Sequence, residues 1–150
     1  MPWIENCAKH EVAKALHHDP GPNNLLICID DLNCTWVKPK FSFRETHKFE
    51  FLDLETSDLS WCPQEALISD QQAEQLVEIL QHALHNNTNV VVHCTAGICR
   101  SGAVVEVAVA MGFQDLEKWR SPNLLVKHKM MKVLGLEFDP LETHKIRDEF

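Results

Sequence analysis

The chain has 150 residues and a mass of 17.2 kDa, enough for one domain with a core of its own. Its hydrophobic content of 45% and charged content of 24% are those of an ordinary globular protein, and no segment is long and apolar enough to cross a bilayer. The formal net charge of −8, with no basic patch to interrupt it, excludes nucleic acid and anionic membrane surfaces as expected partners.

The N-terminal sequence MPWIENCAKH has no basic region followed by an apolar stretch, so we expect no secretory signal and predict a cytoplasmic protein. The chain shows no repeat, low-complexity tract or linker, and residues 1–150 are therefore expected to form a single domain. Such a domain needs no disulfide bridges, which predicts reduced thiols at the six scattered cysteines, at positions 7, 28, 34, 62, 94 and 99.

The first half of the chain predicts one helix and two strands. Residues 8–18 have helical spacing and stop at DPGPNN, a loop dense in turn residues. Residues 25–30, LLICID, form a short apolar run that suits a buried strand. After the break at Pro39, the stretch THKFEFLDL alternates apolar and polar residues, which places Phe49 and Phe51 on one face of a second strand.

The middle of the chain predicts a helix followed by a central strand. Residues 69–84 open with Ser69 as the N-cap and Asp70 in the first turn, and then repeat apolar residues at helical spacing. Residues 89–94, NVVVHC, are a β-branched run with little polar interruption, as in a strand covered on both faces.

Two helices complete the predicted elements. One begins at Arg100, is apolar nearly all round and ends at Gly112. The other has Ser121 as its cap, Pro122 at its first position and Gly135 as its stop. Because helices and strands alternate, the predicted class is α/β with a mainly parallel sheet.

The stretch NVVVHCTAGICRSG, residues 89–102, joins the central strand to a buried helix through a tight loop. Such a loop gathers backbone N–H groups around one point, and the helix dipole adds positive potential, so it binds an oxyanion. The same field favours a nucleophilic thiolate at Cys94, the first loop position. Arg100 offers a planar fork to two phosphate oxygens, and Gly97 lets the backbone curl through positive φ.

The sequence HCTAGICRSG resembles the signature loop of the cysteine-dependent protein tyrosine phosphatase superfamily, which reads His-Cys, five residues, Arg, and Ser or Thr. The order of elements over roughly residues 25–135 looks like the small dual-specificity branch, including its compact bacterial and viral members. Low-molecular-weight phosphatases share the Cys-four-Cys-Arg-Ser spacing, but their loop lies near the N-terminus. The resemblance implies a three-layer α/β sandwich with a central mainly parallel sheet flanked by helices.

The resemblance also implies a mechanism in which Cys94 attacks phosphorus and forms a phosphocysteine. The departing thiolate is then stabilised by Ser101, and the loop is oriented by His93 through hydrogen bonding. No metal and no cofactor are required. Phosphate binding is implied for the loop residues Thr95, Ala96, Gly97, Ile98, Cys99 and Arg100.

The reaction needs a proton donor for the leaving oxygen. In the dual-specificity branch this donor is an aspartate just past the strand, with apolar residues two and four positions earlier, and Asp53 has Phe51 and Phe49 in those places. The loop that follows is long for this branch, so Asp58 is the second candidate and Glu55 the third.

Two further patterns, one of cysteines and one of histidines, bear on the chemistry of the chain. Cys99 could reach Cys94 within the tight loop and form a disulfide that protects the nucleophile, or it could only pack beneath the loop as a small apolar residue. The nine histidines do not predict zinc, because His17 and His18 are adjacent and no Cys-two-Cys pair exists.

The predicted function is a phosphoprotein phosphatase acting on phosphotyrosine, with phosphoserine and phosphothreonine as further candidate substrates. The loop sequence TAGIC carries no lysine, which argues against inositol lipids, and the net charge of −8 disfavours RNA 5′-triphosphatase activity. The alternatives are a catalytically weak module that binds phosphorylated partners, a phosphatase of a non-protein phosphomonoester or an RNA 5′-phosphate, and a rhodanese-like sulfur carrier. The sequence does not determine the oligomeric state.

Overall fold

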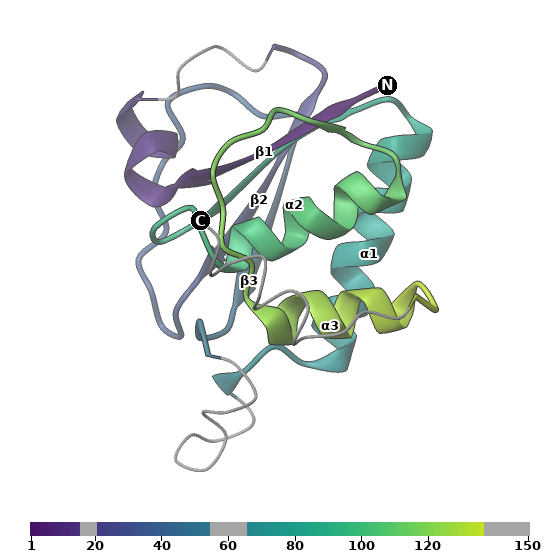
Figure 1. Cartoon of the computed structure of the whole chain (residues 1–150). Helices are drawn as coiled ribbons and strands as arrows, with labels where there is room; N and C mark the ends of the chain where they lie inside the picture. The colour runs from purple at the N-terminus through teal and green to yellow at the C-terminus, as the bar shows by residue number, and fades with distance from the viewer. Residues whose placement is uncertain (16–20, 55–65, 137–150) are drawn as a thin grey trace.

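A five-stranded parallel sheet forms the centre of the fold (Figure 1). The computed structural model describes residues 1–15, 21–54 and 66–136. The strands lie in the order β3-β2-β4-β1-β5, and every pairing is parallel. Their bounds are Trp3–Ala8 for β1, Asn24–Asp30 for β2, Glu45–Glu50 for β3, Asn89–Cys94 for β4 and Gln114–Asp115 for β5.

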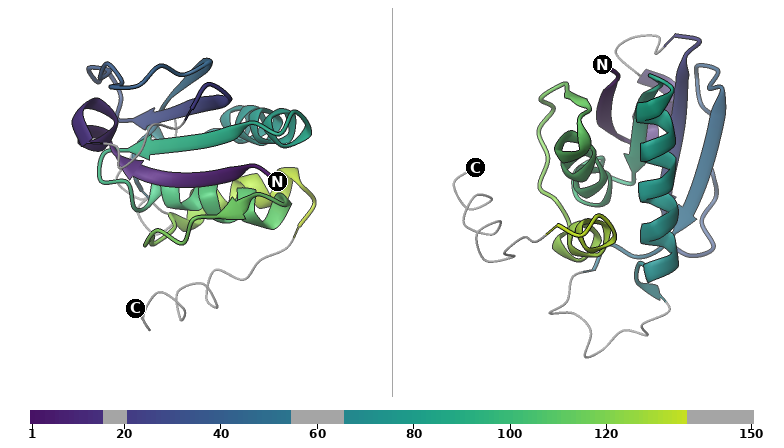
Figure 2. Two further views of the ribbon diagram at one scale, coloured as in Figure 1. Left: turned by 90° about the horizontal axis from the view of Figure 1, so that it is seen from above. Right: turned by 90° about the vertical axis from the view of Figure 1, so that its right-hand side faces the viewer.

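Three helices cover one face of the sheet, namely α1 (Asp70–His85), α2 (Arg100–Met111) and α3 (Leu124–Val133) (Figure 2). Alternate strand residues such as Leu25, Val90 and Ile4, which are neighbours in register, point into this helical layer. Together with the apolar sides of the helices they form the main core. The α2 helix is buried along most of its length because it lies between the sheet and α3.

The other face of the sheet has a smaller core. It contains Leu26, Cys28 and Val91, the strand residues that alternate with those of the main core. Val12 of the short π-helix η1 (Glu11–Ala15) packs there, together with aromatic residues of the segment 36–43. The predicted three-layer α/β sandwich is therefore confirmed, with its second outer layer made of η1 and irregular chain.

Most predicted elements are confirmed. The strands at 24–30 and 89–94 form as expected, and β3 is followed by Phe51, which shares the main core with Phe49. The α1 helix begins after Ser69, whose Oγ accepts from the Gln72 amide in a full capping box. The α2 helix runs from Arg100 and is capped by Gly112.

The prediction for the N-terminus was wrong in part. Residues 3–8 form β1, which was not predicted. Within the predicted helix 8–18, residues 9–15 are helical, with 11–15 as η1, while 16–18 lie outside the described residues. The strand β1 was not recognised from the sequence because it contains two polar residues, Glu5 and Asn6, that are nonetheless buried in the sheet. The two-residue strand β5 was also not predicted.

The predicted cap of the last helix was wrong too. Asn123 caps α3, two residues after Ser121, and its Oδ1 accepts from the amide of Val126. The helix ends at Val133, close to the predicted stop at Gly135. Of the helices within the described residues, none is long and apolar enough to span a bilayer.

Candidate active site

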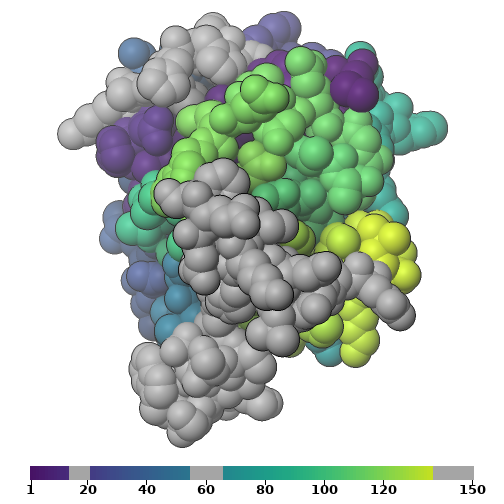
Figure 3. Space-filling model, in the orientation of Figure 1, coloured from purple at the N-terminus to yellow at the C-terminus, as the bar shows by residue number. Residues whose placement is uncertain are grey.

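The loop that joins β4 to α2 lies at the carboxyl ends of the parallel strands β1, β2 and β4. This edge of a parallel sheet is where α/β proteins bind their ligands. The segment between α2 and α3 runs along the surface beside the N-terminal residues (Figure 3). Ser121 and Asn123 of this segment bind the loop directly, and Trp119 binds Asn6, which also binds the loop.

The backbone carbonyl groups of the loop are held by donors from outside it. These donors come from β1, from the residue that follows it and from the segment before α3. They are Lys9 N to Thr95 O at 3.3 Å, Asn6 Nδ2 to Gly97 O at 2.7 Å, Ser121 N to Ile98 O at 3.2 Å and Asn123 N to Cys99 O at 2.9 Å.

With its carbonyl groups bound from outside, the loop keeps backbone N–H groups for a ligand. Within the described part of the chain, the amides of Ala96, Gly97 and Ile98 donate no hydrogen bond. The α2 helix begins directly behind them and carries no acidic residue in its first turn. Unpaired amides at a helix N-terminus attract an anion, so the loop can hold a phosphate group.

Cys94 lies at the end of β4 and is 2% exposed. Its Sγ is 3.1 Å from the Oγ of Ser101, a hydroxyl on the first turn of α2. Burial raises the pKa of Cys7 strongly and that of Cys28 to about 12, so those two thiols stay protonated at neutral pH. The Sγ of Cys94 lies beside the first turn of α2, within hydrogen-bond distance of the Ser101 hydroxyl group.

Arg100 is 3% exposed, and the structure fixes its orientation. Its Nη1 donates to Asp31 Oδ1 at 2.9 Å and to Phe51 O at 2.7 Å, and its Nη2 donates to Thr95 Oγ1 at 3.1 Å. The Nε atom is buried and has no partner among the described residues. The anchored Nη1 side therefore leaves Nε available, and Nε and Nη2 form an edge of the guanidinium whose geometry suits two oxygens of a phosphate group.

The end of β2 supplies two carboxylates to the site. Asp30 accepts from Lys9 Nζ at 2.5 Å and from Thr95 Oγ1 at 3.3 Å. Partial burial acts to raise the pKa of Asp30, but the hydrogen bonds from Lys9 and from the Asp31 amide outweigh it and lower the pKa. Asp30 is therefore ionised at neutral pH and holds one side of the loop through Thr95.

Asp53, the first candidate for the general acid, is exposed and lies three residues after the end of β3. Its Oδ1 accepts from Asn123 Nδ2 at 2.8 Å. Residues 51–54, here called the acid segment, are linked in two ways to residues 94–100, here called the phosphate loop. The carbonyl oxygen of Phe51 accepts from Arg100 Nη1, and Asn123, which binds Asp53, also donates through its backbone to Cys99 O. Asp58 and Glu55, the other candidates, lie outside the described residues.

His93 precedes the nucleophile and is fully buried on the smaller core's side of the sheet, between Cys7 and Cys28 in register. Neither ring nitrogen has a partner in the described part of the chain. Burial, opposed by the charge of Asp30 and reinforced by those of Lys9 and Arg100, lowers the pKa of His93 to about 4. The imidazole is therefore neutral at neutral pH, and its role in orienting the loop stays a prediction.

Lowering the pH from about 6.5 to 4 is expected to destabilise the protein through His93. The unfolded chain binds a proton near the ordinary pKa of 6.5 and the folded chain only near 4, so the stabilising contribution is complete above 6.5 and is lost as the pH falls. The loss is about 3 kcal/mol. Urea unfolding across this pH range should show a weaker pH dependence in His93→Gln, whereas the exposed control His82→Gln should follow the wild type. Equal pH dependence in all three proteins would contradict the prediction.

Cys99, the predicted partner of a protective disulfide, is the N-cap residue of α2 and is partly exposed. Cys94 and Cys99 are both free thiols in this structure, and the disulfide stays a prediction. Among the residues that the structure describes, no group of three or more histidine, cysteine or acidic side chains is arranged to hold a metal ion.

Several residues of the site were not found from the sequence. Asp30 is the last residue of the apolar strand β2 and Asp31 follows it, and two charges at the carboxyl end of a parallel strand are a signal that could have identified them. Asn6 and Asn123 gave no such signal, since only the fold brings them to the loop. Each is almost fully buried, at 2% and 1% exposure.

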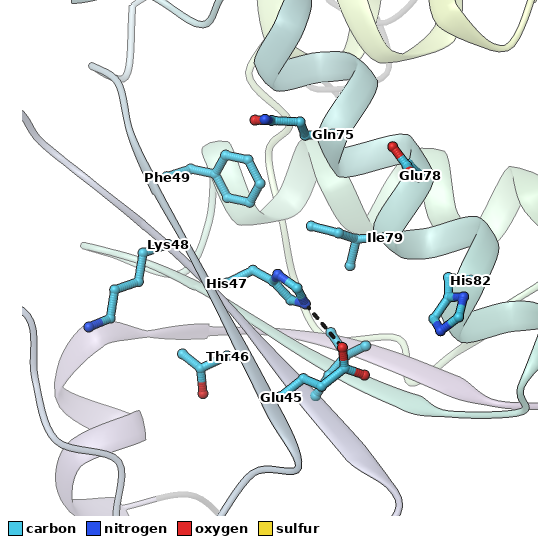
Figure 4. A pocket seen from close by; sticks show the side chains of 10 residues that line it. Glu45, Thr46, His47, Lys48, Phe49, Gln75, Glu78, Ile79 and His82 are labelled. Carbon is cyan, nitrogen blue, oxygen red and sulfur yellow. Dashed lines mark ion pairs between the residues drawn. The ribbon is translucent and has the colours of Figure 1, made fainter.

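A cavity of about 530 Å³ lies elsewhere, between the edge strand β3 and helix α1 (Figure 4). Glu45, His47 and Phe49 line it from the strand, and Glu78 and His82 from the helix. No residue of the phosphate loop borders it. The chemistry of the site therefore does not involve this cavity.

Comparison with known proteins gives the following matches. The family described as dual specificity phosphatase, catalytic domain, matches residues 28–112, more than half of the chain. No curated protein sequence matches. Among solved structures, a human tyrosine phosphatase-like serine/threonine/tyrosine-interacting protein has a TM-score of 0.54 at 16% identity, with 99% of this chain and 91% of that chain covered. Tk-PTP in the active form has a TM-score of 0.45 at 12% identity, with the same coverage of 99% and 91%.

The human structure shares the fold, and the family match spans the strand, loop and helix that carry Cys94 and Arg100. Both agree with the resemblance seen in the loop sequence, which is confirmed. This chain belongs to the dual specificity phosphatase catalytic domain family.

Proposed function

We propose that this protein hydrolyses phosphomonoesters of protein side chains, phosphotyrosine first and phosphoserine and phosphothreonine second, through a phosphocysteine intermediate. The observation that carries the proposal is the anchored guanidinium of Arg100, whose buried Nε has no partner among the described residues, beside a loop whose amides at 96–98 donate to none of them. A buried donor without a partner costs free energy in the unliganded protein, and a phosphate oxygen would satisfy it. Family membership supports phosphatase activity in general.

The first step forms the S–P bond between Cys94 and the substrate and breaks the P–O bond to the leaving group, which takes a proton from Asp53. In the second step Asp53 accepts a proton from water, the water oxygen bonds to phosphorus, and the S–P bond breaks. Ser101 Oγ, 3.1 Å from the sulfur, donates to the departing thiolate. Arg100 and the loop amides stabilise the charge on the phosphoryl oxygens in both steps.

A second candidate function is the binding of phosphorylated partners without turnover. One structure with this fold is described as tyrosine phosphatase-like and interacting with serine, threonine and tyrosine, and that description refers to the human protein. The site described above would bind a phosphoryl group in either case. Turnover separates the two functions.

Phosphate release from phosphotyrosine and phosphoserine peptides across pH tests the proposal. The wild type is expected to turn over, with phosphotyrosine the faster substrate. Asp53→Asn is expected to lose about 10²-fold in rate and the basic limb of the pH profile, because the donated proton is gone. Asp58→Asn is the matched control and should retain both the wild-type rate and the basic limb of the pH profile.

Binding of the peptides without turnover would favour the second function. Loss of the basic limb in Asp58→Asn, with Asp53→Asn unaffected, would transfer the general acid role to Asp58.

A further inference from the structure

Asn123 lies where three segments meet: the acid segment, the phosphate loop and the start of α3. It is 1% exposed, and it is the N-cap residue of α3. Its side chain reaches the acid segment and its backbone reaches the phosphate loop. No other described residue binds both the Asp53 side chain and the phosphate loop.

The orientation of the Asn123 amide group is determined by its three side-chain hydrogen bonds. Its Oδ1 accepts from the backbone amide of Val126 at 3.1 Å, which caps the helix. Both hydrogens of Nδ2 are then directed at the acid segment, one to Asp53 Oδ1 at 2.8 Å and the other to Leu54 O at 3.0 Å. A rotated amide would place an oxygen against two acceptors, so only this orientation is satisfied.

The backbone of the same residue holds the phosphate loop. Asn123 N donates to Cys99 O at 2.9 Å, one residue before Arg100. The distance between the Asp53 carboxyl group and the phosphate loop is thus set through one residue that is rigidly held at a helix start. Asp53 itself is exposed, and apart from the Asn123 bond its side chain makes no hydrogen bond or ion pair with the described residues.

We infer that Asn123 is a positioning residue for proton transfer, which holds Asp53 so that its second oxygen carries the proton toward the leaving group. Oδ1 is occupied by the Asn123 donor, so the transferable proton resides on Oδ2. Without this bond the carboxyl group would rotate freely in solvent, and a misplaced proton donor loses much of its effect. The inference rests on the proposed function, in which Asp53 is the general acid.

The leaving group provides the test. Phenyl phosphate has a poor leaving group that needs the proton, whereas para-nitrophenyl phosphate has a good one that needs it less. We compare kcat for both substrates in the wild type, Asp53→Asn and Asn123→Ser. Serine still caps the helix, but it is too short to bind Asp53 and Leu54 together. Asn123→Asp, which keeps the cap and the length but has no donor, is the second variant should Asn123→Ser fold poorly.

Asp53→Asn is expected to lose about 10²-fold on phenyl phosphate and far less on para-nitrophenyl phosphate. Asn123→Ser is expected to show the same selective loss, of about 10-fold, and no further selective loss in the double variant with Asp53→Asn. Ser69→Ala, which removes the cap of α1 away from the site, controls for general destabilisation and should leave the ratio of the two rates unchanged.

Equal losses on both substrates in the Asn123 variants, or no loss, would overturn the inference and leave the proposed function intact. If Asp53→Asn shows no leaving-group selectivity while the wild type turns over, Asp53 is not the acid and the inference fails with that assignment. An inactive wild type would overturn the proposed function itself.

Discussion

Replacement of Cys94 by serine is expected to abolish turnover, with a loss in kcat of at least about 10⁴-fold. A hydroxyl group at this position cannot act as the sulfur anion does, because an alcohol is far harder to ionise than a thiol. Serine is close to cysteine in size and can keep the contact with Ser101, now as an O–H···O hydrogen bond. The fold and the anion-binding loop should therefore remain, and the variant should still bind inorganic phosphate or tungstate.

The matched control is Cys28→Ser, the same change at another buried cysteine. Cys28 is 4% exposed and lies on the opposite face of the sheet, where burial keeps it protonated. Its replacement should lower stability and leave kcat near that of the wild type. Release of para-nitrophenol and calorimetric titration with tungstate measure the two properties. Turnover in Cys94→Ser at the wild-type rate would show that the nucleophile lies elsewhere.

Replacement of Gly97 by alanine is expected to disrupt the phosphate loop. Gly97 has a φ of +74°, and an added Cβ would lie 2.3 Å from the carbonyl carbon of Cys7 and 2.4 Å from the amide of Ala8. Both atoms belong to the backbone of β1, which cannot move aside as a flexible side chain would. Backbone strain and overpacking each cost about 1–3 kcal/mol, and a displaced loop would lose about 10²-fold or more in kcat/KM.

The control variant Gly135→Ala separates the effect of backbone strain at positive φ from the effect of steric overlap with β1. Gly135 also has positive φ, at +72°, but nothing lies within 4 Å of the added Cβ. This control should show only the cost of the backbone conformation and should retain activity. Urea unfolding and para-nitrophenyl phosphate hydrolysis measure both effects. A Gly97→Ala protein as stable and active as Gly135→Ala would mean that the loop does not pack against β1 as described.

The sequence correctly predicted those elements whose conformation depends only on residues close to one another in the chain. The apolar run of β4, the N-cap at Ser69 and the glycine that ends α2 each depend on residues within a few positions, and all three are confirmed. The prediction failed for β1, whose Glu5 and Asn6 look like surface residues. Asn6 is buried because its amide binds Gly97 O and Trp119 O, which lie 91 and 113 residues away in the chain.

By itself, the sequence determined that a tight loop with Cys94 at its start and Arg100 at its end joins a buried strand to a buried helix, because the fourteen residues 89–102 encode strand, loop and the start of the helix together. Only the tertiary structure decided what holds that loop: Asn6, Asp31 and Asn123 come from three other segments. Their hydrogen bonds join residues far apart in the chain. Such contacts leave no periodicity or spacing in the sequence, since they depend on the order of strands in the sheet and on the helices packed against it.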